Sequence, residues 1–337
     1  MQKTIYTGDI AQQTPVISAL SIHNLENNKI HRFMFQSSQM NIGQYWYVPV
    51  FVANGKKPGK SILLNTGVHG DELNGIRVIQ KIFENLDTEN LSGSIIGVLQ
   101  ASPNSLTHIS KNWHLSTDGG DFENMNRMYP GNENGNTASY HAYLLWNKLW
   151  KDNVDYVIDL HSQSTDTEYP LFVFADYRNS IAKEMAELIP ADQIKNDEGE
   201  KGTVETTFIE HGIPAITIEL GAARTFQTDY INRSIIGINN IFTHLGFIDN
   251  HTVTQTAKTQ KSIIGDNMYS VKALHGGYAE ILVKIGEKIT SGQVVAKQLN
   301  AFGDVIQEYV SEQSGTVVSV NTGALREKGG LLVRILY

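Results

Sequence analysis

Short apolar runs alternate with amphipathic helical patterns through most of this chain, and that alternation limits the fold more than any other feature. Four runs are nearly continuous in apolar residues, as expected of strands that helices cover on both faces. They lie at 61–65, 95–99, 156–160 and 215–220. Between them, apolar side chains recur at steps of three and four, as in Ile76, Ile79 and Phe83. The pattern predicts a layered α/β domain.

Different patterns flank this region on either side. Residues 1–50 mix short apolar runs with polar breaks and are predicted to form a β segment that opens a main domain at 1–250. Residues 251–262 are polar, lack periodicity and are predicted to be a linker. Short alternating strands with glycine turns follow, so residues 263–337 are predicted to form a small β-barrel-like domain.

The composition argues against several classes of protein. Cysteine is absent, which excludes disulfides, a cysteine nucleophile and thiolate metal ligands, and which suits a cytoplasmic protein. The 35 acidic residues outnumber the 27 basic ones, and no basic tract interrupts them, so we expect neither nucleic acid nor an anionic membrane as a partner. No apolar run approaches the roughly 18 residues that span a bilayer, and we expect no secretory signal.

A candidate metal site begins in the sequence Gly67-Val68-His69-Gly70-Asp71-Glu72, where a predicted strand ends and a helix begins. Ligand sites in α/β proteins gather outside the carboxyl ends of strands, so the location suits a site. The spacing of His69 and Glu72 can place an imidazole and a carboxylate on one side of a turn. Taken alone, the pair indicates an ordinary helix start, where acidic side chains are favoured.

Two further strand ends change that interpretation. His161 ends one apolar run, and Asp159, two residues earlier, is placed to orient its imidazole from behind. Glu219 ends another run, where a buried carboxylate without a partner costs roughly several kcal/mol. A core salt bridge would satisfy Glu219, but a glutamate beside a metal-activated water can instead take and return a proton. Three protein ligands leave zinc a fourth position for water, so the three strand ends together indicate a hydrolytic site.

The ordered set of motifs resembles the zinc carboxypeptidase superfamily, and most closely its succinylglutamate desuccinylase/aspartoacylase branch. The motifs are His69-x-x-Glu72, Asn124-Met125-Asn126-Arg127, Asp159-Leu160-His161 and Thr217-Ile218-Glu219-Leu220-Gly221. A trailing β domain is also typical of the branch, and the resemblance runs from about residue 45 to the C-terminus. It implies a mixed central sheet with helices on both faces, followed by a small C-terminal all-β domain.

The resemblance also implies roles for individual residues. It implies one zinc ion per chain, bound by His69, Glu72 and His161, with Glu219 as the general base and acid. It implies that Asn126 and Arg127 bind the carboxylate of the substrate. A guanidinium matches a carboxylate with two parallel hydrogen bonds, and an adjacent amide adds a third. The implied activity is hydrolysis of an amide bond in a small carboxylate-bearing substrate, such as an N-acyl amino acid.

Two features depart from the family pattern or extend it. Relatives usually carry a further arginine upstream of the Asn-Arg pair, which helps to polarise the scissile carbonyl, but residues 110–119 contain none. Lys111 and His114 are the candidates to replace it. The C-terminal region has the rhythm of biotinyl or lipoyl carrier domains, yet the turn at 311–315 lacks the lysine that a carrier needs. We therefore expect this region to be a lid, a wall of the site or an oligomer contact, and a homo-oligomer is compatible with the sequence.

Four other interpretations use the same residues. A zinc carboxypeptidase acting on short peptides needs the same apparatus and differs in the pocket beyond Arg127. A non-haem iron oxygenase also binds its metal through two histidines and one carboxylate, but needs no base such as Glu219. A non-catalytic, metal-dependent binding protein would hold a ligand without turning it over. In a metal-free α/β protein, the set of motifs would be a coincidence.

Overall fold

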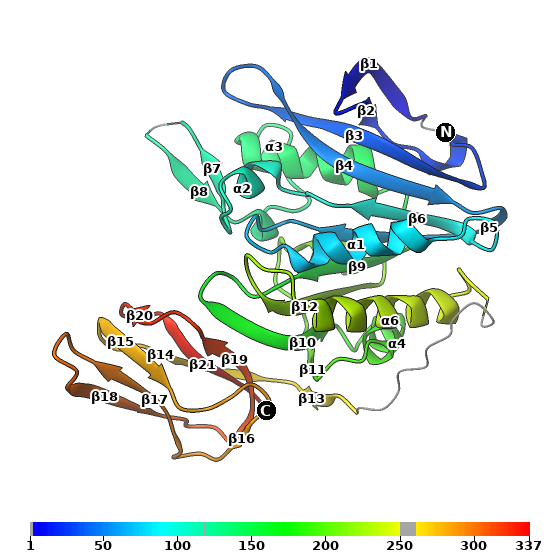
Figure 1. Ribbon diagram of the computed structural model, residues 1–337. Coiled ribbons are helices and arrows are strands. Elements are labelled where there is room, and N and C mark those ends of the chain that lie inside the picture. The colour runs from blue at the N-terminus through cyan, green and yellow to red at the C-terminus, as the bar shows by residue number, and fades with distance from the viewer. Residues whose placement is uncertain (1–2, 118, 250–260) are drawn as a thin grey trace.

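The structure is a computed structural model that describes residues 3–117, 119–249 and 261–337. Figure 1 shows a layered α/β body with a smaller β domain, coloured orange and red, beside one end of it. The described residues form a 15-stranded mixed sheet, a separate four-stranded sheet and a two-stranded hairpin. This arrangement confirms the predicted fold class. Most of the predicted linker, residues 251–260, lies outside the described residues.

Four parallel strands form the centre of the large sheet. In spatial order they are β6 (Ser92–Val98), β5 (Lys57–Thr66), β9 (Tyr156–His161) and β12 (Ala215–Ala222). Their apolar runs are buried on both faces, as Ile62, Leu63 and Leu64 show with no exposed surface. Because the four strands run in the same direction, their carboxyl ends lie along one edge of the sheet.

Further strands extend the sheet on both sides of this centre. Next to β6 follow β4 (Tyr45–Asn54), β3 (Lys29–Gln39), β2 (Thr14–Ala19) and β1 (Ile5–Ala11). Next to β12 follow β10 (Thr167–Ala175), β11 (Gln193–Asn196) and β13 (Ile263–Gly265). The β10 strand is antiparallel to β12, and β4 is antiparallel to β6, so the sheet is mixed.

Helices cover both faces of the sheet. One face packs against α1 (Asn74–Asn85), α4 (Ser180–Leu188) and α6 (Thr228–His244). The other packs against α3 (Thr137–Leu144), the π-helix η3 (Leu145–Trp150) and α5 (Val204–Glu210). Side chains alternate along β5, so Ile62 and Leu64 join the first core and Leu63 joins the second. None of the described helices is both long and apolar enough to cross a bilayer.

Shorter elements line the loops near the strand ends. They are η1 (Ile22–Asn24), α2 (Pro103–Thr107), η2 (Met125–Arg127) and the hairpin of β7 (Trp113–Leu115) with β8 (Asp121–Glu123). The helix α2 begins at Pro103, a residue suited to a first helical position because it lacks the amide proton that would be unpaired there.

The C-terminal β domain is continuous with the main sheet, a feature that the sequence did not predict. Its strands β14 (Met268–Lys272), β16 (Lys288–Ile289), β19 (Gly315–Asn321) and β21 (Leu331–Leu336) belong to the large sheet. The join is between β10 and β19, where Thr167 pairs with Asn321. The four-stranded sheet contains β15 (Gly277–Ile281), β17 (Val294–Leu299), β18 (Val305–Val310) and β20 (Leu325–Arg326). A core that includes Val295, Val317 and Leu332 fills the domain.

Candidate metal centre

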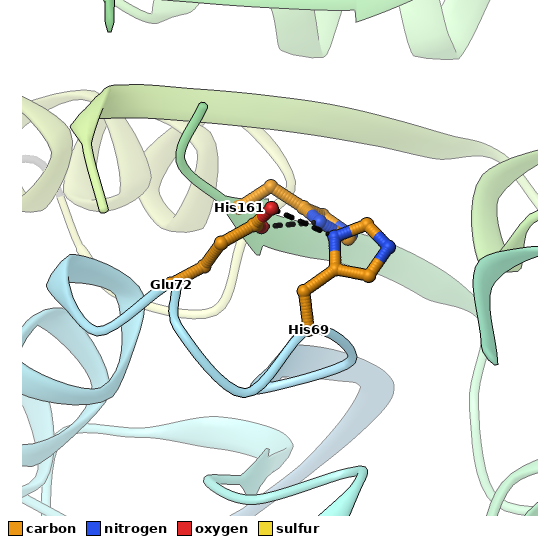
Figure 2. Close-up of side chains that lie close together, drawn as sticks. All are labelled: His69, Glu72 and His161. Carbon is orange, nitrogen blue, oxygen red and sulfur yellow. Dashed lines mark hydrogen bonds and ion pairs between the residues drawn. The ribbon is translucent and has the colours of Figure 1, made fainter. Parts of the chain in front are cut away.

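His69, Glu72 and His161 converge at the carboxyl ends of the central strands, as Figure 2 shows. The carboxylate of Glu72 contacts both imidazoles, one with each of its oxygens. Its Oε1 is 2.7 Å from His69 Nδ1, and its Oε2 is 2.9 Å from His161 Nδ1. One ligand atom from each residue lies within 4.8 Å of the others. All three side chains are buried, so the structure brings together the three residues predicted to bind metal.

The loop between β5 and α1 supplies two members of this cluster. Gly70 lies between them against α2, where a side-chain Cβ would come within 2.0 Å of the backbone oxygen of Ser105. Only glycine allows so close an approach. The Gly70 amide also donates to the Ser110 carbonyl at 2.8 Å. The loop is therefore held against α2, which fixes His69 and Glu72 relative to the sheet.

Strand β9 supplies the second histidine. His161 is its last residue, and it pairs with Glu219 on the parallel strand β12. The next amide, that of Ser162, donates to Glu72 Oε2 at 3.1 Å. The backbone of β9 therefore binds the same carboxylate oxygen that the imidazole of His161 contacts.

Each imidazole has a polar partner on the side away from Glu72. His161 Nε2 lies 2.7 Å from Asp159 Oδ2, and Asp159 Oδ1 in turn accepts from Asn65 Nδ2 at 2.7 Å. His69 Nε2 lies 3.0 Å from Asn124 Oδ1. Because both Nε2 atoms face acceptors, the Nδ1 atoms that face Glu72 are the ones available to a metal. Asp159 was anticipated from its position two residues before His161, whereas Asn124 was part of a quoted motif without an assigned role.

Burial and charge shift the pKa values of the cluster. Burial disfavours the charged imidazole of His161, but the carboxylates of Asp159 and Glu72 outweigh it and hold the pKa of His161 well above its ordinary value. Burial likewise opposes the charged form of Glu72, but His69 and His161 hold the pKa of this carboxyl below its ordinary value. The pocket therefore favours an ionised carboxylate with positive charge beside it.

The donor set fits a divalent metal ion. The two Nδ1 atoms face the same carboxylate, while each Nε2 faces an acceptor. A metal ion bound by the two Nδ1 atoms and the carboxylate would bring positive charge to a buried site that holds the carboxylates of Glu72 and Asp159. Two imidazoles and one carboxylate are a ligand set that zinc accepts, and they leave one position open.

Glu219 lies on β12 beside this cluster, and its side chain is poised to accept a proton. Its Oε2 is buried and has no hydrogen-bond partner among the residues that the structure describes. Burial, and then the negative charge of Glu72, raise the pKa of Glu219 to about 8, against opposing effects of His161 and Lys111. A buried carboxylate oxygen without a partner is a mark of a functional site more than of a structural one.

Asn126 and Arg127 lie on η2, next to Asn124; Asn126 contacts the first residue of α5, and Arg127 contacts the loop before it. Asn126 Oδ1 accepts from the Val204 amide at 2.9 Å. The guanidinium of Arg127 forms an ion pair with Glu200 at 2.5 Å and is 41% exposed. Asn124 connects this segment to His69, so the predicted carboxylate-binding pair borders the metal cluster without contacting it.

Of the two candidates for the missing arginine, Lys111 is the one directed towards the cluster. Its Nζ donates to Ser164 Oγ at 3.0 Å, in the segment that follows His161. His114 instead stacks on His108, with ring centroids 4.1 Å apart, and its Nε2 lies 3.0 Å from Ser110 Oγ. The sequence alone did not distinguish the two, because their contacts are with different parts of the chain: Lys111 with Ser164, and His114 with His108.

Comparison with known proteins gives a family match. Residues 58–245, more than half of the chain, match the family described as the succinylglutamate desuccinylase/aspartoacylase catalytic domain. The N-alpha-acetyl-L-2,4-diaminobutyric acid deacetylase of Halomonas elongata is 25% identical over 291 residues, which cover 82% of this chain and 83% of that protein.

Two solved structures share the fold. The product-bound ectoine utilization protein EutE (DoeB) of Ruegeria pomeroyi superposes with a TM-score of 0.81 at 17% identity, over 94% of this chain and 98% of that one. A succinylglutamate desuccinylase from a Silicibacter species superposes with a TM-score of 0.79 at 19% identity, over 93% of this chain and 98% of that one. At these identities the likeness shows a common fold.

Proposed function

Because this chain belongs to the succinylglutamate desuccinylase/aspartoacylase family, we propose that it is a zinc-dependent hydrolase of the amide bond in a small N-acylated amino acid. The observation that carries the proposal is the contact of the Glu72 carboxylate with the Nδ1 atoms of both His69 and His161, with Glu219 beside them on the next strand. The name of the Halomonas relative, a deacetylase of an N-acetylated amino acid, supports the same class of substrate.

In this proposal His69, Glu72 and His161 hold the zinc ion. Zinc bound there supplies a Lewis acid that lowers the pKa of water and polarises a carbonyl. Asp159 and Asn124 keep the Nδ1 atoms directed at the metal through their contacts with the Nε2 atoms. Burial of the cluster excludes competing water and strengthens these interactions.

Glu219 acts as the proton carrier. Its unpartnered Oε2 takes a proton from the attacking water as the water oxygen bonds to the amide carbon. When the carbon–nitrogen bond breaks, the same oxygen delivers that proton to the departing nitrogen. The pKa of Glu219 is raised to about 8 by burial and by Glu72; a metal ion held by His69, Glu72 and His161 would lower it and so favour the carboxylate form near neutral pH.

Arg127 and Asn126 bind the carboxylate of the substrate and orient its amide towards the metal. Glu200 pairs with Arg127, so a substrate carboxylate would take the place of Glu200. Lys111 stabilises the negative charge that develops on the carbonyl oxygen. Its position beside the segment after His161 and its effect on Glu219 support this role.

A substrate panel tests the proposal. The zinc-loaded protein is incubated with N-acetyl and N-succinyl amino acids and, in parallel, with dipeptides, and the release of free amine is measured. We expect turnover of acylated amino acids that is lost in the Glu219→Gln variant. Turnover of dipeptides alone would favour a carboxypeptidase, and binding without turnover would favour a metal-dependent binding protein.

A further inference from the structure

We propose that Arg326, in the C-terminal β domain, is a positioning residue for the metal centre and acts through the segment 162–167. The inference rests on the proposed metal site. It also gives the C-terminal domain a role: the domain would hold the segment 162–167, whose residues contact the metal ligands, in position.

One side of the segment contacts the metal centre. The Ser162 amide donates to Glu72 Oε2, and Ser164 Oγ accepts from Lys111 Nζ at 3.0 Å. Thr165 donates twice to Asp71 Oδ2, from its amide at 3.0 Å and from its hydroxyl at 2.7 Å. Asp71 directly precedes the ligand Glu72 and is 2% exposed. A shift of this segment would therefore move hydrogen bonds that orient the Glu72 carboxylate.

The other side of the segment contacts the C-terminal domain through Asp166. Arg326 Nη2 donates to the Asp166 carbonyl at 2.5 Å, and Nη1 lies 3.4 Å from Asp166 Oδ2. The Thr322 amide donates to the same carbonyl at 2.9 Å. The β10–β19 pairing begins at the next residue, Thr167, opposite Asn321. Asp166 is thus the point at which the domain holds the segment.

The backbone of Asp166 needs such support. Its φ of 65° lies in the left-handed region, which residues with a Cβ disfavour. The side chain of Asp166 is 56% exposed, so it is not held by burial. Its backbone carbonyl is the group that receives both donors from the C-terminal domain, and these contacts hold the turn in this conformation.

Arg326 is itself anchored. Its side chain is 14% exposed, and its Nε donates to the Leu331 carbonyl at 3.3 Å within the domain. The planar guanidinium therefore bridges Leu331 and Asp166 with donors in a fixed arrangement. A lysine carries its three donors on one nitrogen, so it does not reproduce the separated Nε and Nη2 donors that Arg326 directs at Leu331 and Asp166. This difference provides a graded test.

The test is the dissociation constant of zinc, measured by competition with a chelator, in wild type, Arg326→Met and Arg326→Lys. Lys297→Met is the matched control, because Lys297 lies in the same domain and pairs with Glu308 on the four-stranded sheet. We expect Arg326→Met to raise the zinc dissociation constant about tenfold, at the low end of the effect of losing a group that contacts a ligand. The zinc dissociation constant of Arg326→Lys should lie between those of Arg326→Met and wild type. That of Lys297→Met should equal the wild-type value.

Hydrogen exchange in the metal-free proteins separates local positioning from a general loss of stability. In Arg326→Met the amides of Ser162 and Thr165 should exchange faster, while those of the central strand β5 stay protected. An unchanged zinc dissociation constant in folded Arg326→Met would overturn the inference. If that variant does not fold, Thr165→Val removes the shorter of the two hydrogen bonds from the segment to Asp71 and leaves the one from the amide; an unchanged constant there would overturn the inference equally. Failure of the wild-type protein to bind zinc would instead contradict the proposed function.

Discussion

Glu219 and His161 are paired residues on the adjacent parallel strands β12 and β9. Neighbouring strands lie about 4.8 Å apart, so the pairing fixes a candidate metal ligand and a candidate proton carrier side by side on rigid backbone. Both residues come at the ends of apolar runs that are buried on both faces of the sheet. The relationship between base and metal in the proposed mechanism therefore follows from the sheet and does not require a loop to close.

Replacing Glu219 with glutamine should abolish catalysis and preserve metal binding. The amide keeps the shape of the side chain but cannot take a proton, and no ligand to the metal is lost. We expect kcat to fall by roughly 10²–10⁴-fold, the usual contribution of general acid–base catalysis. Steady-state kinetics and zinc content are measured on the same preparations. A kcat close to that of wild type would contradict the assignment of Glu219.

Zinc should stabilise the protein more as the pH rises. In the metal-free protein the folded-state pKa of His161 lies well above the ordinary 6.5, so the stability contributed by its proton is fully present below about pH 6.5 and is lost as the pH rises through the folded-state value. Zinc competes with that proton and binds better at higher pH. Thermal unfolding of metal-free and zinc-loaded protein between pH 6 and 9 should show a widening gap. A gap that narrows with pH would contradict this account.

At low pH the cluster should affect stability in the opposite direction: the contribution of Glu72 is lost as the pH falls. Glu72 has a pKa below its ordinary 4.5 in the folded protein, so its contribution to stability is present above about pH 4.5 and is lost as the pH falls through the folded-state value. Glu72→Gln should remove this dependence from the metal-free protein. Unfolding midpoints between pH 3 and 6, compared with wild type, provide the measurement. An identical acid dependence in both proteins would show that Glu72 is not responsible.

Lys111 should affect both the rate and its pH dependence. Its positive charge lowers the pKa of Glu219, so Lys111→Met should raise that pKa and move the acidic limb of the kcat/KM profile to higher pH. The variant should also lower kcat, because the charge on the carbonyl oxygen loses a partner. Lys111→Arg keeps the charge and should retain the wild-type limb. A limb that stays in place in Lys111→Met would contradict the proximity of Lys111 to the base.

The ion pair of Arg127 with Glu200 leads to two opposite effects on KM. Arg127→Met should raise KM by roughly 10–100-fold, since a charge-assisted hydrogen bond contributes about 1.5–3 kcal/mol. Glu200→Gln frees the guanidinium and should lower KM by up to about fivefold, because an exposed ion pair is worth at most about 1 kcal/mol. Glu198→Gln, which alters a neighbouring acid that pairs with Arg178, is the control. An increase in KM in Glu200→Gln would mean that Glu200 supports binding.

The convergence of His69, Glu72 and His161 was predictable because parallel strands end at one edge of a sheet. His161 ends one apolar run, and His69 and Glu72 lie in the loop that directly follows another, so both positions fall at that edge. The same reasoning placed Glu219 in that group, since an isolated carboxylate in such a run needs a reason to be buried. These inferences use only local sequence, because a buried strand is recognisable from its continuous run of apolar residues.

Contacts between distant loops were not predictable in the same way. The pairing of Arg127 with Glu200 joins residues in two irregular loops, and nothing in the local pattern of either loop specifies the other. The same holds for Asn124 with His69, and for Arg326 with Asp166 across 160 positions. The join between β10 and β19 was missed because the C-terminal strands look self-contained in sequence, whereas the edge that they cover belongs to the main sheet.

The central claim is that His69, Glu72 and His161 bind one zinc ion, and elemental analysis tests it most directly. Wild type, His161→Ala and His211→Ala are purified without chelators or a metal-binding tag. His211, whose Nδ1 lies 2.7 Å from the Thr207 carbonyl on α5, is the matched control outside the cluster. We predict about one zinc per chain in wild type and His211→Ala, and a loss of most of it in His161→Ala. Wild-type protein that binds no metal, even after zinc is added back, or zinc retained in full by His161→Ala, would contradict the account.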